Sequence, residues 1–541
     1  MISGHMQLTD FNIIQILQHA SRWHGNVEVV TNTVEGGIYR TNYSQLYHRT
    51  KKLANALEKL GVQAGDRVAT MAWNSWRHLE CWYAIGGMGA VCHTLNPRLF
   101  PDQIDYIVNH AQNKFIFVDK TFVPVLANVI DRLPTIRGLI VLTDADNMPD
   151  MSEFSVPVYC YEDLIRDEPV EYKWPTIDEN TASSLCYTSG TTGNPKGVLY
   201  SHRSNLVHSM VTTGSDLFDI KASDSFLMIV PMFHANSWGL AFGVPMVGAK
   251  LVMTGPHMDG ASVYQLMADE KCTKSGAVPT VWTGLIDYLD KNDLQIPYMR
   301  ETYIGGSAVP RSMIENFDKK YNVDVIHAWG MTEMSPLGTL NRPLPFMDNM
   351  SFDQRMDIRV KQGRVPFGID MKIIDDKGNE LPQDGVAFGS LLVKGPWVVE
   401  RYYKAEQTAL DEDGWFDTGD VANIDKHGYM QITDRAKDVI KSGGEWISSV
   451  DIENTAVGHP ELQIAACIGI KHVKWEERPL LIAVKKDGCD PSKASILNLI
   501  ASEHAKWQVP DDVVFIDEMP LTATGKIDKK PLRKNYVNHY S

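Results

Sequence analysis

The chain has 541 residues, of which 44% are hydrophobic and 22% charged, the balance of an ordinary folded protein. Lys and Arg number 52 against 67 Asp and Glu, and the formal net charge of -15 argues against a general nucleic-acid or membrane-surface binder. The seven cysteines are scattered with no CxxC pair, so we expect the reducing cytoplasm and neither a disulfide framework nor a zinc site. No run reaches the roughly 18 apolar residues of a membrane helix.

The predicted elements begin with a helix from residue 44 to 60, where leucines recur at helical spacing up to Gly61. Residues 67–72 then predict a short strand, and residues 76–89 a second helix. Further short apolar runs predict strands at residues 115–118, 139–142, 226–230, 251–253 and 324–326. Most of these runs are separated by enough sequence for a helix, and strands that alternate with helices form parallel sheets with helices on both faces.

From about residue 360 the pattern changes to shorter segments divided by glycines, which predict hairpins rather than crossovers. Examples are residues 373–378 and 424–428, where isoleucine is followed by aspartate, lysine and glycine. The final hundred residues mix three strand-like runs with one helical stretch, at 465–470, 480–484, 513–516 and 493–504. A chain of this length is too long for one core, so we expect a large N-terminal part and a small separate C-terminal domain.

The most informative segment spans residues 187–197 and reads Tyr-Thr-Ser-Gly-Thr-Thr-Gly-Asn-Pro-Lys-Gly. Its hydroxyls, glycines and cation are Thr188, Ser189, Gly190, Thr191, Thr192, Gly193 and Lys196. Glycines let backbone N–H groups close around an anion, and the hydroxyls and lysine add donors and charge, so a polyphosphate is the natural ligand. By composition alone, a Ser/Thr/Gly surface loop is the alternative. The P-loop NTPase pattern does not fit, because Lys196 is followed by Gly197.

This segment resembles the phosphate loop of the adenylate-forming superfamily, which includes acyl-CoA synthetases, peptide-synthetase adenylation domains and beetle luciferases. Further motifs follow in the family's order between about Ser44 and Lys530. The resemblance implies an α/β fold in which a large N-terminal domain, residues 1–436, has parallel-type sheets flanked by helices and a small β-barrel-like subdomain. A small mobile α+β C-terminal domain, residues 438–541, would follow a hinge at Lys437. ATP, Mg²⁺ and coenzyme A are the implied ligands.

A second segment resembles the family's adenine-and-magnesium motif and comprises His327, Ala328, Trp329, Gly330, Met331, Thr332 and Glu333. Trp329 stands where a tyrosine is commoner, and its flat ring is expected to stack on adenine. Glu333 offers the hard oxygen that Mg²⁺ prefers, and Thr332 a donor for the α-phosphate. The segment Gly305, Gly306, Ser307 and Ala308 is similar to the loop that lets the base approach backbone, with Gly305 also bordering the acid.

The remaining motifs cover the ribose, the hinge, coenzyme A and the α-phosphate. Asp420 and Arg435 match the ribose-binding pair, and Lys437 matches the hinge. Lys441, Gly443, Gly444 and Glu445 belong to a loop that is similar to the one passed by pantetheine in the thioester-forming state. Lys526 matches the lysine that bridges the attacking carboxylate and the α-phosphate.

The implied reaction needs no nucleophilic side chain, because the substrate carboxylate itself attacks the α-phosphorus. The protein must position the reactants and stabilise the spreading negative charge. The side chains expected to do so are Thr188, Lys196, Thr332, Glu333, His234 and Lys526. Coenzyme A then takes the acyl group as a thioester and AMP leaves, so the implied function is ATP-dependent acyl-CoA synthesis.

The acid is indicated by residues 231–239, which match the family segment that borders the acyl pocket. His234 is expected near the carboxylate, and Trp238 stands where long-chain enzymes carry an indole that gates the acyl tunnel. The wider chain resembles bacterial medium- and long-chain fatty acid CoA ligases and 3-methylmercaptopropionate CoA ligases. A short or medium fatty acid and 3-methylmercaptopropionate both remain candidates, with a long-chain acid as the alternative.

Three other function classes share part of the pattern. An adenylation enzyme serving a carrier protein shares the first half-reaction, and a luciferase-like oxygenase shares the nucleotide motifs. A non-catalytic nucleotide-binding scaffold would be expected to lose Lys526, Glu333 or Asp420, and all three are present. We expect a homodimer formed through the larger domain, with no nucleic-acid partner and no integral membrane segment.

Overall fold

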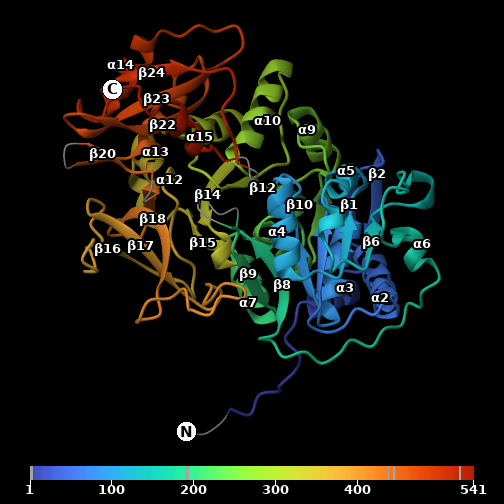
Figure 1. Cartoon of the computed structure of the whole chain (residues 1–541). Helices are drawn as coiled ribbons and strands as arrows, with labels where there is room; N and C mark the ends of the chain where they lie inside the picture. The colour runs from blue at the N-terminus through green and yellow to red at the C-terminus, as the bar shows by residue number, and fades with distance from the viewer. Residues whose placement is uncertain (1–3, 189–193, 436–437, 443–444, 523–525, 541) are drawn as a thin grey trace.

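The described residues of the computed structural model form four sheets with helices packed on them (Figure 1). They are residues 4–188, 194–435, 438–442, 445–522 and 526–540, without the side chains of residues 445 and 446. The α/β fold expected from the sequence is confirmed. Across these ranges, no helix has the length and apolar character needed to cross a membrane.

The first large sheet has seven strands in the order β7-β6-β5-β3-β4-β8-β9. Their bounds are β3 Arg67–Met71, β4 Val91–Thr94, β5 Phe115–Val118, β6 Gly138–Val141, β7 Val158–Cys160, β8 Ala182–Tyr187 and β9 Gly197–Ser201. Neighbouring strands run parallel except β8 and β9, which form an antiparallel pair. The strands predicted from residue 67 and at residues 115–118 and 139–142 are confirmed here.

The second large sheet has eight strands in the order β15-β14-β13-β12-β10-β11-β1-β2. Their bounds are β1 Glu28–Asn32, β2 Ile38–Asn42, β10 Ser225–Met228, β11 Lys250–Met253, β12 Lys274–Ala277, β13 Glu301–Ile304, β14 Asp324–Gly330 and β15 Leu337–Leu340. The inner pairs are parallel, and the edge strands β2 and β15 are antiparallel to their neighbours. Strand β14 is longer than the predicted 324–326 because pairing with β15 extends it to Gly330.

The helices before residue 440 are α1 Ile14–Trp23, α2 Tyr43–Lys59, α3 Trp76–Gly87, α4 Pro101–Ala111, α5 Val123–Ala127, α6 Tyr161–Arg166, α7 His202–Thr212, α8 Leu240–Val247, α9 Gly260–Asp269, α10 Pro279–Asn292, α11 Arg311–Asn316 and α12 Phe352–Arg359. Short 3-10 or π turns are η1 Lys120–Phe122, η2 Ile130–Arg132, η3 Ala145–Asn147, η4 Ala235–Gly239, η5 Phe317–Tyr321, η6 Thr332–Met334 and η7 Pro345–Asn349.

Helix α3 joins the two large sheets. It contacts β3, β4 and β8 of the first sheet and β1 of the second, and all of its residues are buried. Its N-terminus is capped by Ser75, whose side chain accepts a hydrogen bond from the backbone N–H of His78. A helix buried on every side must satisfy its polar residues internally, and Glu80 does so through a 2.7 Å ion pair with Arg49. This helix therefore holds both sheets in one rigid body.

Two smaller sheets follow in sequence. The first is antiparallel, in the order β16-β17-β18-β19, with bounds β16 Asp370–Ile374, β17 Phe388–Lys394, β18 Phe416–Ile424 and β19 Met430–Arg435. The hairpins predicted after residue 360 are confirmed by this antiparallel pairing, which forms the predicted small subdomain. The second small sheet belongs to the C-terminal unit, drawn orange to red in Figure 1.

The C-terminal unit contains β20 Ile440–Ser442, β21 Glu445–Ile447, β22 Leu462–His472, β23 Glu476–Lys485, β24 Asp512–Phe515 and the helices α13 Ser449–Val457, α14 Lys493–Glu503 and α15 Lys529–Asn535. Its own apolar core includes Ile452, Cys467 and Leu481. A separate core is the physical mark of a separate domain. The boundary at Lys437 lies outside the described residues and stays a prediction.

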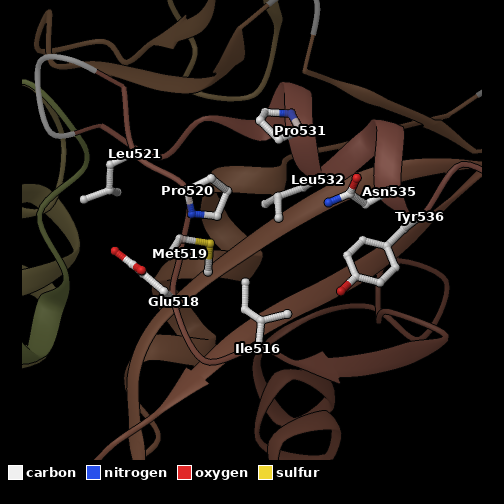
Figure 2. Close-up of a pocket in the computed structure, with 9 residues that line it drawn as sticks. All are labelled: Ile516, Glu518, Met519, Pro520, Leu521, Pro531, Leu532, Asn535 and Tyr536. Carbon is white, nitrogen blue, oxygen red and sulfur yellow. The ribbon is translucent and has the colours of Figure 1, made fainter. Parts of the chain in front are cut away.

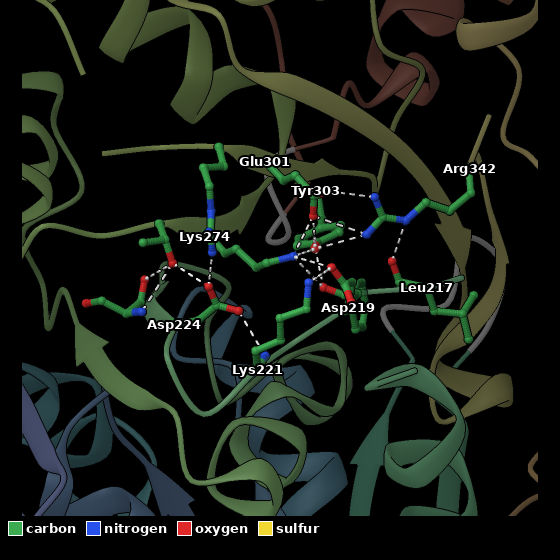
Figure 3. A network of polar contacts seen from close by, with 12 residues as sticks. Leu217, Asp219, Lys221, Asp224, Lys274, Glu301, Tyr303 and Arg342 are labelled. Carbon is green, nitrogen blue, oxygen red and sulfur yellow. Dashed lines mark hydrogen bonds and ion pairs between the residues drawn. The ribbon is translucent and has the colours of Figure 1, made fainter. Parts of the chain in front are cut away.

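A buried cluster of charges lies at the amino ends of β12 and β13, and we name it the support cluster (Figure 3). It comprises Asp219, Lys274, Glu301, Tyr303 and Arg342. Glu301 pairs with Arg342 and with Lys274, each at 2.6 Å. The segments that the sequence analysis assigned to ligands follow the opposite, carboxyl ends of these strands, where open α/β sheets bind ligands.

Candidate functional site

The predicted phosphate loop leaves the first sheet between the antiparallel strands β8 and β9. Its base is closed by two hydrogen bonds, from Thr188 N to Lys196 O at 2.9 Å and from Lys196 N to Thr188 Oγ1 at 3.4 Å. Strand register brings Tyr187 opposite Gly197 at the same point. The structure thus holds Thr188 and Lys196 side by side. The predicted phosphate ligands Ser189, Gly190, Thr191, Thr192 and Gly193 lie outside the described residues.

The predicted adenine loop follows the adjacent strands β13 and β14 of the second sheet. Gly305 and Gly330 must be glycines, because a Cβ would come within 2.6 Å of Ala328 O and 2.1 Å of Pro336 O respectively. Gly306 has a φ of +85°, a conformation that favours glycine. The segments that follow β13 and β14 therefore pack closely against neighbouring backbone at positions that have no side chain.

The other members of these two loops differ in exposure. Ser307 is exposed, Ala308, Gly330, Met331 and Thr332 are partly exposed, and His327 and Ala328 are buried. The His327 Nδ1 lies 2.9 Å from Val360 O. Burial lowers the pKa of His327 to about 4, so this ring is neutral at physiological pH. The loop therefore offers backbone, hydroxyls and small side chains rather than cations.

Trp329 lies on β14 with only 8% of its surface exposed. Its indole covers Gly338, where a Cβ would lie 2.3 Å from the ring, and its Nε1–H donates to Asp420 Oδ2 at 3.0 Å. Asp420 faces Arg435 across β18 and β19, with Arg435 Nε 3.4 Å from its Oδ1. The two predicted ribose residues are thus neighbours, and Trp329 orients one of them. Stacking of Trp329 on adenine stays a prediction.

Glu333 follows Thr332 in the short turn η6 and is 9% exposed. Tyr402 Oη donates to Glu333 Oε1 at 2.9 Å, and no described cation lies within ion-pair distance of this carboxylate. Burial raises the pKa of Glu333, although the Tyr402 hydrogen bond and the charges of Arg435 and Lys196 oppose that rise. A buried carboxylate with a single neutral partner fits a divalent cation well, so the donor set suits Mg²⁺.

Lys526 reaches the same place from the C-terminal unit. Its side chain lies beside Gly306, where a Cβ would be 4.0 Å from Lys526 Cε, and its charge acts on Asp420 and His234. Burial and the nearby Arg435 lower the pKa of Lys526 to about 8, although Asp420 and Glu333 oppose this. The structure therefore joins the last predicted motif to the adenine and ribose motifs.

Lys526 is hydrogen-bonded to Thr522. Thr522 N donates to Lys526 O at 2.6 Å, Lys526 N to Thr522 Oγ1 at 3.2 Å, and Leu521 bridges to Ile527. Pro520 and Leu521 also line a cavity of about 520 Å³ against α15, together with polar side chains such as Glu518 and Asn535 (Figure 2). Hydrogen bonds to Thr522 therefore fix the backbone of Lys526.

The predicted acid-binding segment forms an unusual left-handed turn. Four consecutive residues other than glycine have positive φ angles of 42°, 53°, 49° and 56°: Ala235, Asn236, Ser237 and Trp238. Each such residue costs about 1–2 kcal/mol in a left-handed helix, so surrounding contacts must fix the turn. Asn236 Nδ2 donates to Asn205 Oδ1 at 3.0 Å, and Ser237 Oγ donates to Val230 O at 2.7 Å.

His234 precedes this left-handed turn, and Trp238 is its last residue. His234 and Phe233 line a cavity of about 20 Å³ together with Tyr187, enough for about one water. Burial and the nearby Lys526 lower the pKa of His234 to about 4, so the ring is neutral. The Trp238 indole reaches Gly276, where a Cβ would lie 3.6 Å from its Cζ3. The turn thus presents a neutral imidazole on the side of Lys526.

The predicted coenzyme A loop lies on the C-terminal sheet. Lys441 is exposed on β20, and its backbone N–H donates to Glu477 Oε2 at 3.0 Å. Glu445 pairs in register with Ser442 across β20 and β21. Gly443, Gly444 and the hinge residue Lys437 lie outside the described residues, so their predicted roles stay predictions.

Sequence reasoning missed the residues that hold these motifs in place, among them Tyr200, Asn205, Asn236 and Tyr402. Tyr200 Oη donates to Thr332 O at 2.6 Å and Tyr402 Oη to Glu333, although both tyrosines lie far from residue 332 in sequence. No local pattern marks such partners. Only Asn236 among these four carries a local signal, because asparagine adopts the left-handed conformation more readily than most residues, and the sequence analysis did not use that signal.

Known proteins resemble this chain in sequence and in fold. A family model described as "AMP-binding enzyme" matches residues 17–403, and its C-terminal domain model matches residues 451–526. The chain is 48% identical over 533 residues to a 3-methylmercaptopropionyl-CoA ligase of Ruegeria lacuscaerulensis, covering 98% of each chain. It is 47% identical to a medium-chain-fatty-acid–CoA ligase of Ectopseudomonas oleovorans, covering 98% of this chain and 97% of the other. The crystal structure of the anthranilate CoA ligase AuaEII with anthranoyl-AMP matches with a TM-score of 0.87, at 24% identity and 98% coverage of both chains.

The chain belongs to the AMP-binding enzyme family. It is an enzyme of the acid–thiol ligase class, an ATP-dependent acyl-CoA synthetase that forms AMP. A carboxylic acid, ATP and coenzyme A are its substrates.

Proposed function

We propose that this acyl-CoA synthetase acts on a short- or medium-chain fatty acid or on 3-methylmercaptopropionate. The 3-methylmercaptopropionyl-CoA ligase and the medium-chain-fatty-acid–CoA ligase support both acids, since each is nearly half identical to this chain over almost its full length. The cavity beside His234, about 20 Å³, has room for about one water, so binding of any of these acids requires it to enlarge. A long-chain fatty acid is the alternative.

The observation that carries the proposal is the position of Lys526 between the acid and nucleotide motifs. Its charge acts on Asp420 on one side and on His234 on the other, and Gly306 leaves room beside it. A cation between a carboxylate nucleophile and the α-phosphate lowers the energy of the negatively charged transition state. At neutral pH, Lys526 is protonated because its pKa is about 8.

In the first step, an oxygen of the acid attacks the α-phosphorus and the bond to pyrophosphate breaks. Lys526 would stabilise the charge on the α-phosphate and the attacking carboxylate, and Lys196 with Thr188 would hold the β- and γ-phosphates. Glu333 would hold Mg²⁺, which neutralises charge on the leaving pyrophosphate. His234, neutral at this pH, would orient the carboxylate without pairing with it as a cation.

The nucleoside of ATP would lie against the loop after β13, the end of β14 and the ribose-binding pair. Asp420 and Arg435 would take the ribose hydroxyls, and residues 305–308 with 327–331 would receive the base against bare backbone. The main support is the close approach of Gly305 to Ala328 and of Gly330 to Pro336.

In the second step, the thiol sulfur of coenzyme A attacks the acyl carbon, and AMP leaves. Lys526 and the Lys441–Glu445 loop belong to the same C-terminal unit, so a rotation about Lys437 would exchange one for the other. Acyl-adenylates hydrolyse readily, and such an exchange would keep water out until coenzyme A is bound.

The test is coenzyme A-dependent AMP release with acetate, butyrate, octanoate, palmitate, benzoate and 3-methylmercaptopropionate. We expect the highest kcat/KM with an acid of four to eight heavy chain atoms, because 3-methylmercaptopropionate and the short- and medium-chain fatty acids fall in this range. Highest activity with palmitate would contradict the proposal and favour the long-chain alternative. AMP formation that needs a carrier protein instead of coenzyme A would indicate an adenylation enzyme, and absence of AMP with every acid a scaffold.

We also propose that the enzyme forms a homodimer through its larger domain and works in the cytoplasm. The scattered cysteines, all free, support a reducing compartment. Sedimentation equilibrium would give twice the mass of 60.7 kDa for the homodimer, and a single-chain mass would contradict it.

A further inference from the structure

A short segment that belongs to none of the predicted ligand motifs is bonded to two of them. Residues 399–403 follow β17 and lie between the phosphate loop and the turn η6. At one end, Val399 N donates to Glu333 O at 2.7 Å, and at the other, Tyr403 N donates to Gly197 O at 2.8 Å. We name this segment the strap, because its backbone connects the residue after Lys196 with the predicted magnesium ligand.

The strap approaches the phosphate loop closely. A Cβ at Gly197 would lie 3.0 Å from Tyr403 Cβ and 3.1 Å from the Tyr187 ring, so only glycine fits without displacing a neighbour. The contact therefore constrains the residue that follows Lys196, and it explains a glycine that phosphate binding alone does not require.

Between its two backbone bonds, the strap carries Tyr402 into the gap between the charged groups. The Tyr402 hydroxyl donates to Glu333 Oε1 at 2.9 Å, and the Lys196 ammonium lies 4.7 Å from the centre of the Tyr402 ring. One aromatic side chain thus contacts both an anion, through its hydroxyl, and a cation, through its face. Among the described residues, Lys196 and Glu333 form no direct ion pair.

The separation of these charges has a chemical consequence. A direct pair between Lys196 and Glu333 would neutralise both groups and leave neither for the polyphosphate and its cation. A ring between them keeps each charge accessible while fixing its direction. Tyrosine is suited to this place, since phenylalanine lacks the donor and an aliphatic residue lacks the ring face.

We propose that Tyr402 is a positioning residue which holds the Lys196 ammonium and the Glu333 carboxylate apart, so that they engage magnesium-bound ATP together. This inference rests on the proposed roles of Lys196 and Glu333 in ATP binding. It assigns a function to the strap, which none of the ligand motifs includes.

The experiment compares three variants of the full chain: Tyr402→Phe, Tyr402→Leu and the control Tyr298→Phe. Tyr298 is an exposed tyrosine with Lys271 5.7 Å from its ring centre, so it matches the chemistry at a surface position outside the site. ATP binding is measured by calorimetry with and without Mg²⁺, in the absence of any acid. AMP release is then measured as a function of Mg²⁺ concentration, and thioester formation from preformed acyl-adenylate is measured separately.

Tyr402→Phe keeps the ring and loses the hydroxyl. Its affinity for metal-free ATP should stay close to that of the parent enzyme, whereas the Mg²⁺ concentration for half-maximal AMP release should rise by about tenfold, as expected for a lost hydrogen bond to a charged group. Tyr402→Leu should also weaken metal-free ATP binding, by about threefold to fivefold, because Lys196 loses the ring face. Thioester formation from the preformed adenylate should hardly change in either variant.

An unchanged Mg²⁺ dependence in Tyr402→Phe would overturn the proposal. So would a uniform loss of all activities accompanied by a lower Tm, because that pattern indicates a structural role alone. Failure of the proposed acid specificity would leave the test intact, since ATP binding is measured without an acid. If the parent enzyme bound ATP equally with and without Mg²⁺, that result would contradict the proposed role of Glu333 in holding Mg²⁺. It would thereby separate a failure of the proposed function from a failure of the inference about Tyr402.

Discussion

The support cluster and the candidate site are two groups of partly buried charges with opposite pKa behaviour. In the support cluster, burial alone would raise the pKa of Glu301, but hydrogen bonds from Arg342 and Lys274 lower it to about 2. In the site, burial raises the pKa of both Glu333 and Asp420, and the cations nearby only oppose that rise. The residues of the support cluster thus compensate the charge of Glu301, whereas those of the candidate site do not fully compensate the charges of Glu333 and Asp420.

The difference follows from what each cluster must do. Glu301 lies within 2.6 Å of two cations and accepts a hydrogen bond from Tyr303 at 2.8 Å, so the folded chain alone stabilises its charge. Glu333 has a tyrosine hydroxyl as its partner, and Lys526 reaches the site only from the C-terminal unit. A site with incomplete charge compensation costs stability but leaves charges available to a ligand. Five predictions test this contrast and the geometry of the site, from the largest expected effect to the smallest.

Lys526→Ala should slow adenylation by roughly 3–4 kcal/mol in barrier height, comparable to the loss of another preorganised donor. The thioester half-reaction from preformed adenylate should change much less, because Lys526 is expected to leave the site in that step. Pyrophosphate release and thioester formation, measured separately, would give the two values. Equal slowing of both steps would disprove the assignment, and unchanged Tm would show that the loss is catalytic.

Glu301→Ala should destabilise the protein by about 3 kcal/mol, because it leaves Lys274 and Arg342 buried without their partner. The KM values for ATP and acid should stay near those of the parent enzyme, since the support cluster lies at the other end of the strands. Urea unfolding followed by tryptophan fluorescence measures the loss. The Glu301→Gln control retains a hydrogen-bond acceptor and should lose less.

The same residue predicts how stability depends on pH. The folded pKa of Glu301, about 2, lies below the unfolded value of about 4.3, so its contribution is complete above that unfolded value and is lost as pH falls toward 2. Glu301→Gln should therefore flatten the stability curve between these two values. A curve parallel to that of the parent protein would show that the pKa of Glu301 is the same in the folded and unfolded states, which would contradict the lowered folded value.

Asn236→Ala should cost about 1–2 kcal/mol of stability, because alanine resists the left-handed conformation and the bond to Asn205 is lost. Asn236→Gly accepts the conformation and removes only the amide, so it should cost less. Both variants should change the kcat/KM ratio between a short and a longer acid while KM for ATP stays constant. If neither variant altered that ratio, the turn would not set the acid preference.

The smallest effect concerns activity at high pH. The folded pKa of Lys526 is about 8, so adenylation should fall as pH rises through that value and the ammonium is lost. Lys526→Arg keeps the charge at high pH and should lose this decline, whatever its absolute rate. A decline of equal midpoint in Lys526→Arg would assign it to another group.

Sequence alone determined much of the fold, because hydrophobic period and length define elements locally. The strand from Arg67, the helix from Trp76 and the C-terminal strand predicted at residues 480–484 lie where the apolar pattern predicts them, and the last of these runs from Glu476 to Lys485. The resemblance of ordered motifs to a known family also named the residues expected in the site. Lys526 was predicted in this way, although it lies in another part of the chain.

Only the tertiary structure decided what holds those residues. Tyr402 and Glu333 are separated by 69 positions, and Asn205 and Asn236 by 31, so no local period connects them. The left-handed turn before Gly239 also depends on such distant bonds, because its own residues disfavour it. The residues expected to bind ligands could thus be named from motifs in the sequence. The residues that hold them in place could not, because they are neighbours only in the folded structure.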